Sequence, residues 1–191
     1  MKLPSLILAS ASPRRAQLLR ELELEFQVVP GNAPEADYQH MTPRELCQLN
    51  AYRKARVVAK RFPDALVLGA DTEVALGARI FGKPANLAEA QRFLTELQGK
   101  THEVVTGVCL AHLRWHRVQL FAVGTKVTFR KLTLAEIDAY LQHIQPLDKA
   151  GAYAIQEHGE LIIKKITGSY SNVVGLPVER LIQELRKFAR R

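Results

Sequence analysis

Short apolar runs alternate along the chain with segments whose apolar residues recur at helical spacing. The first run, Leu6 to Ala9, has the length of a buried strand, and Leu18, Leu19 and Leu22 follow it at helical spacing. A second run, Ala65 to Ala70, holds few polar groups and is typical of a central strand. The same patterns predict strands over 6–9, 25–29, 65–70, 102–113, 117–132 and 160–166, a hairpin within 73–81, and loop and strand over 148–156.

Helix boundaries carry their own signals. Thr133 with Glu136, and Asn86 with Glu89, have the spacing of a capping box, in which two side chains satisfy the first backbone N–H groups of a helix. Helices are therefore expected after Ser12, from Thr42 to about Phe62, from Asn86 to about Leu97, over 134–144 and after Pro177. With no internal repeat and no clear linker, the sequence predicts one mixed α/β domain over residues 1–191, with strands running in both directions.

The loop that joins the first strand to the first helix has an unusual charge. Ser12 is placed to cap the helix and Pro13 to be its first residue, so the N–H groups of residues 14–16 are expected to point outward, unpaired. Arg14 and Arg15 add positive charge at the end of a helix that disfavours cations, which indicates a bound anion near them and the loop serines, including Ser10. The alternative is an ordinary turn whose arginines are solvated or paired with nearby glutamates.

Acidic side chains suggest a metal site. Asp71 directly follows the apolar run Ala65 to Ala70, at a position where ligands commonly bind at the rim of a sheet. Together with Glu35 and Asp37 from a loop, it could hold a hard cation such as Mg²⁺, which uses one or two carboxylates with phosphates and water. The alternative is that these acids only cap or solvate the chain.

Two lysines are candidate phosphate contacts. Lys54 lies in the second expected helix, and Lys83 lies in a loop between Gly82 and Pro84, although each could be an ordinary surface lysine. His112 and His116 are interpreted as surface histidines, because they fall at a strand end and a turn rather than in a zinc motif.

Composition narrows the class of partner. The chain has 27 basic and 19 acidic residues, a net charge of +8, which favours anionic partners without choosing between nucleotides and nucleic acid. Its two cysteines are far apart, and it has neither a signal peptide nor an apolar stretch that could cross a bilayer, so a soluble cytoplasmic protein is expected. Motifs of P-loop, dinucleotide-binding and serine-hydrolase proteins are absent.

Five segments together resemble one family. Each is weak alone, but their order and spacing are similar to those of the Maf family of nucleoside triphosphate pyrophosphatases, nearly from end to end. The segments are Leu8 to Leu19, Gly69 to Thr72, Gly82 to Pro84, Asp148 to Gln156 and Asn172 to Pro177.

The resemblance implies an elongated, curved mixed sheet flanked by helices, with two lobes around a central cleft, commonly in a homodimer. It implies hydrolysis of a nucleoside triphosphate between the α- and β-phosphates, with a divalent cation (Mg²⁺ or Mn²⁺) near Glu35 and Asp71. Asp71 would accept a proton from the attacking water, and the triphosphate would be held by Ser10, Arg14, Arg15, Lys54 and Lys83.

The resemblance also bears on the base. The segment 148–156 matches the branch that acts on dTTP and UTP, which makes Arg14, Thr72 and Gln156 the specificity residues; the other branch prefers 7-methylguanosine triphosphate. An amide such as that of Gln156 can donate to a pyrimidine carbonyl and accept from N3–H.

The chain departs from the family at two positions. Glu73 stands where an apolar residue is usual, either solvated or as an extra metal ligand, and Glu157 stands where glycine often follows the glutamine. A reading from a different class also remains: a basic nucleic-acid-binding or regulatory module without activity, suggested by the charge and by the family's association with cell-division arrest. The retained Asp71 with its basic surroundings favours the enzyme.

Overall fold

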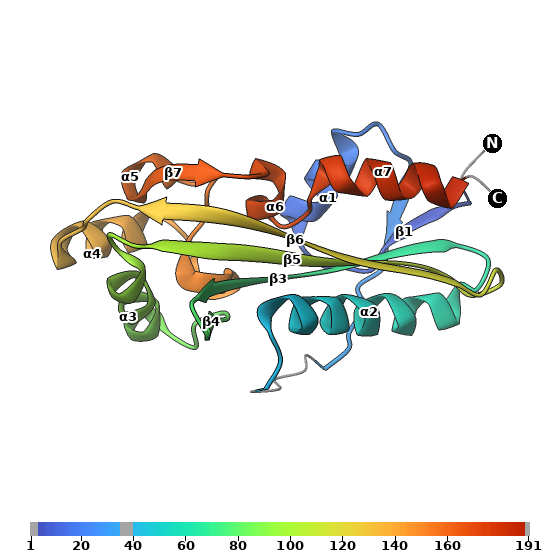
Figure 1. Ribbon diagram of the computed structural model, residues 1–191, viewed down its shortest axis with the longest axis horizontal. Helices are drawn as coiled ribbons and strands as arrows, with labels where there is room; N and C mark the ends of the chain where they lie inside the picture. Colours follow the sequence, from blue (N-terminus) through green and yellow to red (C-terminus); the bar gives the residue numbers. More distant parts are fainter. Residues whose placement is uncertain (1–3, 35–39, 190–191) are drawn as a thin grey trace. The chain divides into compact units, whose positions relative to one another are not determined.

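The computed structural model describes residues 4–34 and 40–189. Its centre is a mixed sheet of seven strands, with helices on both faces (Figure 1). The strands are β1 (Leu6–Leu8), β2 (Phe26–Val28), β3 (Leu66–Leu76), β4 (Arg79–Phe81), β5 (Thr101–His112), β6 (Arg117–Phe129) and β7 (Ile163–Thr167). Their order is β2-β1-β3-β5-β6-β7, with β4 paired to β3. Strand β1 runs parallel to β2 and β3, whereas β4 and β7 run antiparallel to their partners, so the predicted mixed α/β class is confirmed.

The chain forms two compact units. The first comprises residues 1–71, 106–123 and 175–191, and the second comprises 72–105 and 124–174. Strands β3, β5 and β6 each contribute one part to each unit.

In the first unit, helix α2 covers one face of the sheet while α1 and α7 cover the other (Figure 1). The bounds of these helices are Pro13–Arg20 for α1, Pro43–Arg61 for α2 and Val178–Ala189 for α7. Helix α2 lies very close to β3, since a β-carbon added at Gly69 would overlap the carbonyl oxygen of Ala51. Strand β3 continues past Ala70 to Leu76, so Asp71 lies within the strand and not at its end, as the sequence had indicated, and this packing holds α2 against that strand.

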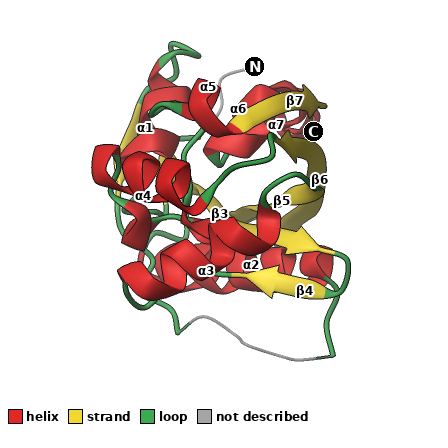
Figure 2. Ribbon diagram, turned by 90° about the vertical axis from the view of Figure 1, so that its left-hand side faces the viewer, coloured by secondary structure: helices red, strands yellow, loops and turns green. Residues whose placement is uncertain are grey.

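The second unit has its own core, which includes Phe81, Leu94, Val127, Phe129 and Tyr140. Helices α3 and α4 pack against each other beside it (Figure 2). The helices of this unit are α3 (Leu87–Leu97), α4 (Leu134–His143), α5 (Gly159–Ile162) and α6 (Tyr170–Val174), with short 3-10 turns at Pro146–Asp148 and Ala150–Ala152.

Most helix boundaries lie where the capping signals place them. Thr42 and Thr133 form complete capping boxes, and Asn86 accepts a hydrogen bond from the N–H group of Glu89. The hairpin around Gly77 also forms, because β3 and β4 pair on either side of it.

Three further expectations are wrong. The segment 148–156 contains turns and no strand, because Gly151 and Ala152 have φ of +69° and +62°, which a strand does not allow. The segment 160–166 begins as the helical turn α5, after the left-handed His158, and is extended only from Ile163. His112 is 2% exposed and stacks on Trp115 at 4.0 Å, so it belongs to the interior of the first unit rather than to the surface.

None of the described helices is long and apolar enough to cross a membrane.

Candidate functional site

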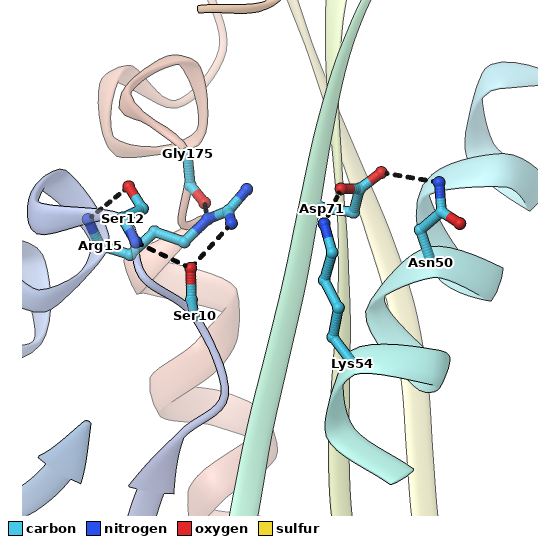
Figure 3. A network of polar contacts seen from close by, with 7 residues as sticks. All are labelled: Ser10, Ser12, Arg15, Asn50, Lys54, Asp71 and Gly175. Carbon is cyan, nitrogen blue, oxygen red and sulfur yellow. Dashed lines mark hydrogen bonds and ion pairs between the residues drawn. The ribbon is translucent and has the colours of Figure 1, made fainter. Parts of the chain in front are cut away.

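The loop between β1 and α1 is organised by its serines (Figure 3). The side chain of Ser12 caps α1 by accepting a hydrogen bond from the N–H group of Arg15 at 3.4 Å, and its carbonyl accepts from Ala16 at 3.3 Å. Two of the three N–H groups that were expected to be unpaired therefore have Ser12 as a partner. Ser10 Oγ accepts from the N–H group of Ser12 at 3.2 Å, which closes the turn.

Arg15 joins this loop to a segment far away in the sequence. Its Nη1 donates to Ser10 Oγ at 3.1 Å, and its Nε donates to the carbonyl oxygen of Gly175, 160 positions later, at 2.9 Å (Figure 3). Arg14 lies beside it on the first turn of α1 and is half-buried. The predicted anion site thus has two arginines at a helix start, one of them fixed by the protein itself.

Asp71 is 5% exposed, and α2 supplies hydrogen-bond donors to both of its carboxylate oxygens. Lys54 Nζ lies 2.6 Å from Oδ1, and Asn50 Nδ2 lies 3.2 Å from Oδ2 (Figure 3). Asn50 and Lys54 are four residues apart, so they project from the same face of the helix. A buried carboxylate requires such donors, because it has left the solvation of water.

Asn50 was missed by the sequence analysis. It is 2% exposed and touches the candidate base directly. The available signal is its position: a polar residue in the apolar stripe of α2, one helical turn before Lys54. Lys54 was expected to contact phosphate, but here it pairs with Asp71, with side chains 13% and 7% exposed.

The acidic side chains at this site can be compared with the predicted metal site. Carboxylate oxygen is a ligand that Mg²⁺ accepts, so Asp71 fits one position of such a site. Glu35 and Asp37, the other acids proposed for it, lie outside the described residues. Within residues 4–34 and 40–189, no cluster of three or more acidic, histidine or cysteine side chains could hold a metal ion.

In the second unit, the turn that carries Lys83 is bonded to the segment that precedes Gln156. The N–H group of Gly151 donates to the carbonyl oxygen of Gly82 at 3.0 Å. Lys83 and Gln156 are exposed, and Thr72 is half-buried. Two motifs that are far apart in the sequence are thereby brought together.

Glu73 is half-buried in the same unit, on β3. Its Oε2 lies 3.9 Å from where a β-carbon on Gly82 would stand. Its role as an extra metal ligand stays a prediction.

A buried lysine braces the segment that carries Gln156. Lys149 is 5% exposed, and its Nζ donates to the carbonyl oxygen of Gln145 at 2.7 Å and to Asp148 Oδ1 at 2.8 Å. It also lies 3.3 Å from Oε2 of Glu157, the residue directly after Gln156. The glutamate that stands in place of the usual glycine is thus an ion-pair partner, a role that spacing alone does not reveal.

Two aromatic side chains fix the backbone of this segment. Tyr140 Oη accepts from the N–H group of Ala154 at 3.1 Å and donates to its carbonyl oxygen at 3.2 Å. Tyr153 shares a hydrogen bond of 2.9 Å with Nε2 of His102, and burial raises the pKa of both phenols. Burial also lowers the pKa of His102 to about 4, and its Nδ1 has no hydrogen-bond partner among the described residues, so protonation there would leave a buried N–H unsatisfied.

Nearly the whole chain, and not only these motifs, is similar to known proteins. The model of the family described as "Maf-like protein" matches residues 5–188. A dTTP/UTP pyrophosphatase from Bacillus cereus (strain ATCC 10987 / NRS 248) is 45% identical over 96% of this chain and 89% of its own. A protein of the same name from Bacillus anthracis (strain CDC 684 / NRRL 3495) is 44% identical over 96% of this chain and 95% of its own.

A solved structure bears on the fold alone. The structure of a HAM1 protein from Coxiella burnetii is similar with a TM-score of 0.52, at 16% identity, over 97% of this chain and 100% of that one. From the family match and from the identity to its curated relatives, the chain belongs to the family of Maf-like proteins.

Proposed function

We propose that this protein is a nucleoside triphosphate pyrophosphatase that hydrolyses dTTP and UTP to the monophosphate and pyrophosphate. The observation that carries the proposal is a buried carboxylate, Asp71, supported by Asn50 and Lys54 in a chain 44–45% identical to proteins named dTTP/UTP pyrophosphatase. Such a group can act as a base only if its surroundings hold it in place, and α2 provides that support.

The phosphates bind at the start of α1. Arg14 and Arg15 supply positive charge there, and the guanidinium of Arg15 is held in place by Ser10 and Gly175. Ser10 Oγ already accepts two hydrogen bonds, from Ser12 and Arg15, so its hydroxyl hydrogen is available for a phosphate oxygen. Lys54 and Lys83 supply further cations, as ammonium groups that can reorient.

Hydrolysis needs a base for the attacking water. The water oxygen forms a bond to the α-phosphorus while the bond from that phosphorus to the bridging oxygen breaks, and pyrophosphate leaves. The water's proton passes to Oδ1 of Asp71, the oxygen that Lys54 covers in the free protein. Lys54 therefore leaves Asp71 for a phosphate oxygen as substrate binds, which exchanges one anionic partner for another.

A divalent cation, Mg²⁺ or Mn²⁺, completes the proposal. Asp71 would hold it together with Glu35 and the phosphates, and the cation would supply charge neutralisation. Removal of the cation with a chelator should stop pyrophosphate release, and addition of Mg²⁺ or Mn²⁺ should restore it.

Gln156 recognises the nucleobase of the substrate, with Thr72 and Arg14 as the other specificity residues. The amide of Gln156 pairs with the carbonyl and N3–H of uracil or thymine, and a base that leaves these groups unpaired is penalised. We expect the protein to act as a homodimer in the cytoplasm, where it would remove triphosphates from the nucleotide pool. Light scattering after size-exclusion chromatography tests the dimer.

The test is a panel of triphosphates. The purified protein is incubated with Mg²⁺ or Mn²⁺ and dTTP, UTP, dCTP, ATP, GTP or 7-methylguanosine triphosphate, and kcat/KM is measured from pyrophosphate release. We expect dTTP and UTP to rank well ahead of the others. A preference for the methylated purine would overturn the choice of base but not the reaction, whereas no release from any triphosphate would favour a non-catalytic, nucleic-acid-binding role.

A further inference from the structure

We propose that Asn50 is a positioning residue that holds the carboxylate of Asp71 in one orientation. This inference rests on the proposed function, because it assigns Asp71 as the base. It starts from the two oxygens of that carboxylate, which are equivalent in solution but not here. Oδ1 faces an ammonium at 2.6 Å, and Oδ2 faces an amide at 3.2 Å.

The two donors differ in how firmly they are held. Asn50 is 2% exposed and has a short side chain. The next residue, Ala51, presses its carbonyl oxygen onto β3 at Gly69, two positions before Asp71, so closely that a β-carbon there would overlap it. The backbone beside Asn50 is therefore packed directly against β3.

Lys54 is the exchangeable donor. Its side chain is 13% exposed and ends a flexible four-carbon stem, so its ammonium can move to another anion. When a phosphate takes the ammonium, Oδ1 loses its partner while Oδ2 keeps the amide. The amide on Oδ2 then keeps the carboxylate in the same plane while Oδ1 exchanges its partner.

The same arrangement survives the proton transfer. Once Oδ1 carries the proton, it becomes a donor and no longer accepts from Lys54, whereas the amide of Asn50 still donates to Oδ2. Asn50 thus supports both the charged and the neutral form of Asp71. A donor on the reacting oxygen cannot do so.

The experiment removes the amide while keeping the volume of the side chain. Asn50→Leu keeps the volume of the side chain but removes the donor to Oδ2 of a buried carboxylate, so its Tm should fall, and its kinetics are measured well below that Tm. With dTTP, its kcat should fall about tenfold. Its KM, and the affinity for α,β-methylene-dTTP measured by calorimetry, should stay within about twofold, because the loss lies in the chemical step.

Two further variants make the result specific. Asn50→Ala removes the amide without adding bulk and covers the case in which leucine does not fit. Val58→Ala removes a fully buried apolar group from the same helix, and it should lower the Tm while leaving kcat unchanged.

A double variant gives the last comparison. In an Asp71→Asn background, Asn50→Leu should change the residual kcat by less than about twofold, because the two residues act as one unit.

An active wild type whose Asn50→Leu and Asn50→Ala variants both retain kcat would overturn the positioning role and leave the proposed function intact. An equal loss of kcat from Asn50→Leu in the wild-type and in the Asp71→Asn background would also overturn it. If the wild type releases no pyrophosphate, the proposed function fails first, and the inference fails with it.

Discussion

Lys54 and Asp71 form an ion pair of 2.6 Å in which both side chains are largely removed from solvent. In the free protein, the proposed base is therefore paired with a proposed phosphate ligand. Breaking such a pair by deleting one charge is costly, because the remaining charge stays partly buried. Substrate phosphates offset the part of that cost that falls on Lys54, since they give it a new anion when it leaves Asp71.

Replacing Asp71 by asparagine should separate chemistry from folding. The variant keeps the shape of the side chain but leaves the largely buried ammonium of Lys54 without this carboxylate, so its Tm should also fall, and kcat is compared on folded protein well below that Tm. It loses the proton acceptor, and kcat for dTTP should fall on the order of a hundredfold or more. Pyrophosphate assays and thermal unfolding measure the two effects; turnover at the wild-type rate would exclude Asp71 as the base.

The adjacent arginines should behave differently when each is replaced by alanine. Arg15 donates to Ser10 and to Gly175, so its loss should lower the free energy of unfolding by about 1–3 kcal/mol. Arg14 is proposed to hold phosphate, and its loss should weaken kcat/KM by roughly 1.5–3 kcal/mol with little change in Tm.

The matched control for the arginines is Arg20→Ala, an exposed arginine in the last turn of α1. This variant should change neither the free energy of unfolding nor kcat/KM. If Arg14→Ala instead melts early and turns over normally while folded, Arg14 is structural.

The sequence predicted those features that depend on residues close together in the chain, and it did not predict contacts between residues far apart in it. The cap at Ser12, the capping signals at Asn86 and Thr133 and the apolar first half of β3 depend on neighbours within a few positions, and they were predicted. The bond from Arg15 to Gly175 spans 160 positions, and no local pattern indicates it. Asn50 was missed for the same reason, since its importance depends on the packing of α2 over β3.

The strand expected within the segment around Gln156 does not form, for a different reason. Its apolar residues, such as Tyr153 and Ile155, suggest a strand, but Gly151 and Ala152 adopt left-handed backbone conformations. Hydrogen bonds from Tyr140 and Lys149 then hold it as turns. Tertiary contacts decide this conformation, and the motif alone only marked its place.

His102 should make stability depend on pH. Its pKa is about 4 in the folded protein and is ordinarily 6.5, so between these values the unfolded chain binds a proton that the folded chain does not. Stability is therefore fully present above about pH 6.5 and is lost as the pH falls toward 4. Between pH 7 and pH 5 the loss from this group is about 2 kcal/mol, which lowers the Tm by roughly 4–8 °C.

The difference between wild type and His102→Gln isolates this effect from the other titrating groups. Unfolding by heat at pH 7, 6 and 5 should show a smaller decline for the variant, and His116→Gln, which alters an exposed histidine, should decline like the wild type. Parallel curves for His102→Gln and the wild type would contradict the buried, neutral histidine.

Glu157 should sharpen the choice of base. Its ion pair with the buried Lys149 ties down the residue that follows Gln156, and a mobile amide would discriminate less between a uracil and a cytosine edge. Glu157 is 41% exposed, so the pair is worth about 1 kcal/mol at most, which limits the effect to roughly fivefold. Glu157→Gln should therefore reduce the ratio of kcat/KM for dTTP over dCTP by about threefold to fivefold, and added salt should reduce the ratio of the wild type in the same direction.

Glu160→Gln, which neutralises a 73% exposed carboxylate three residues later, is the control and should leave the ratio unchanged. A lower Tm for Glu157→Gln with an unchanged ratio would mean that the pair only stabilises the fold.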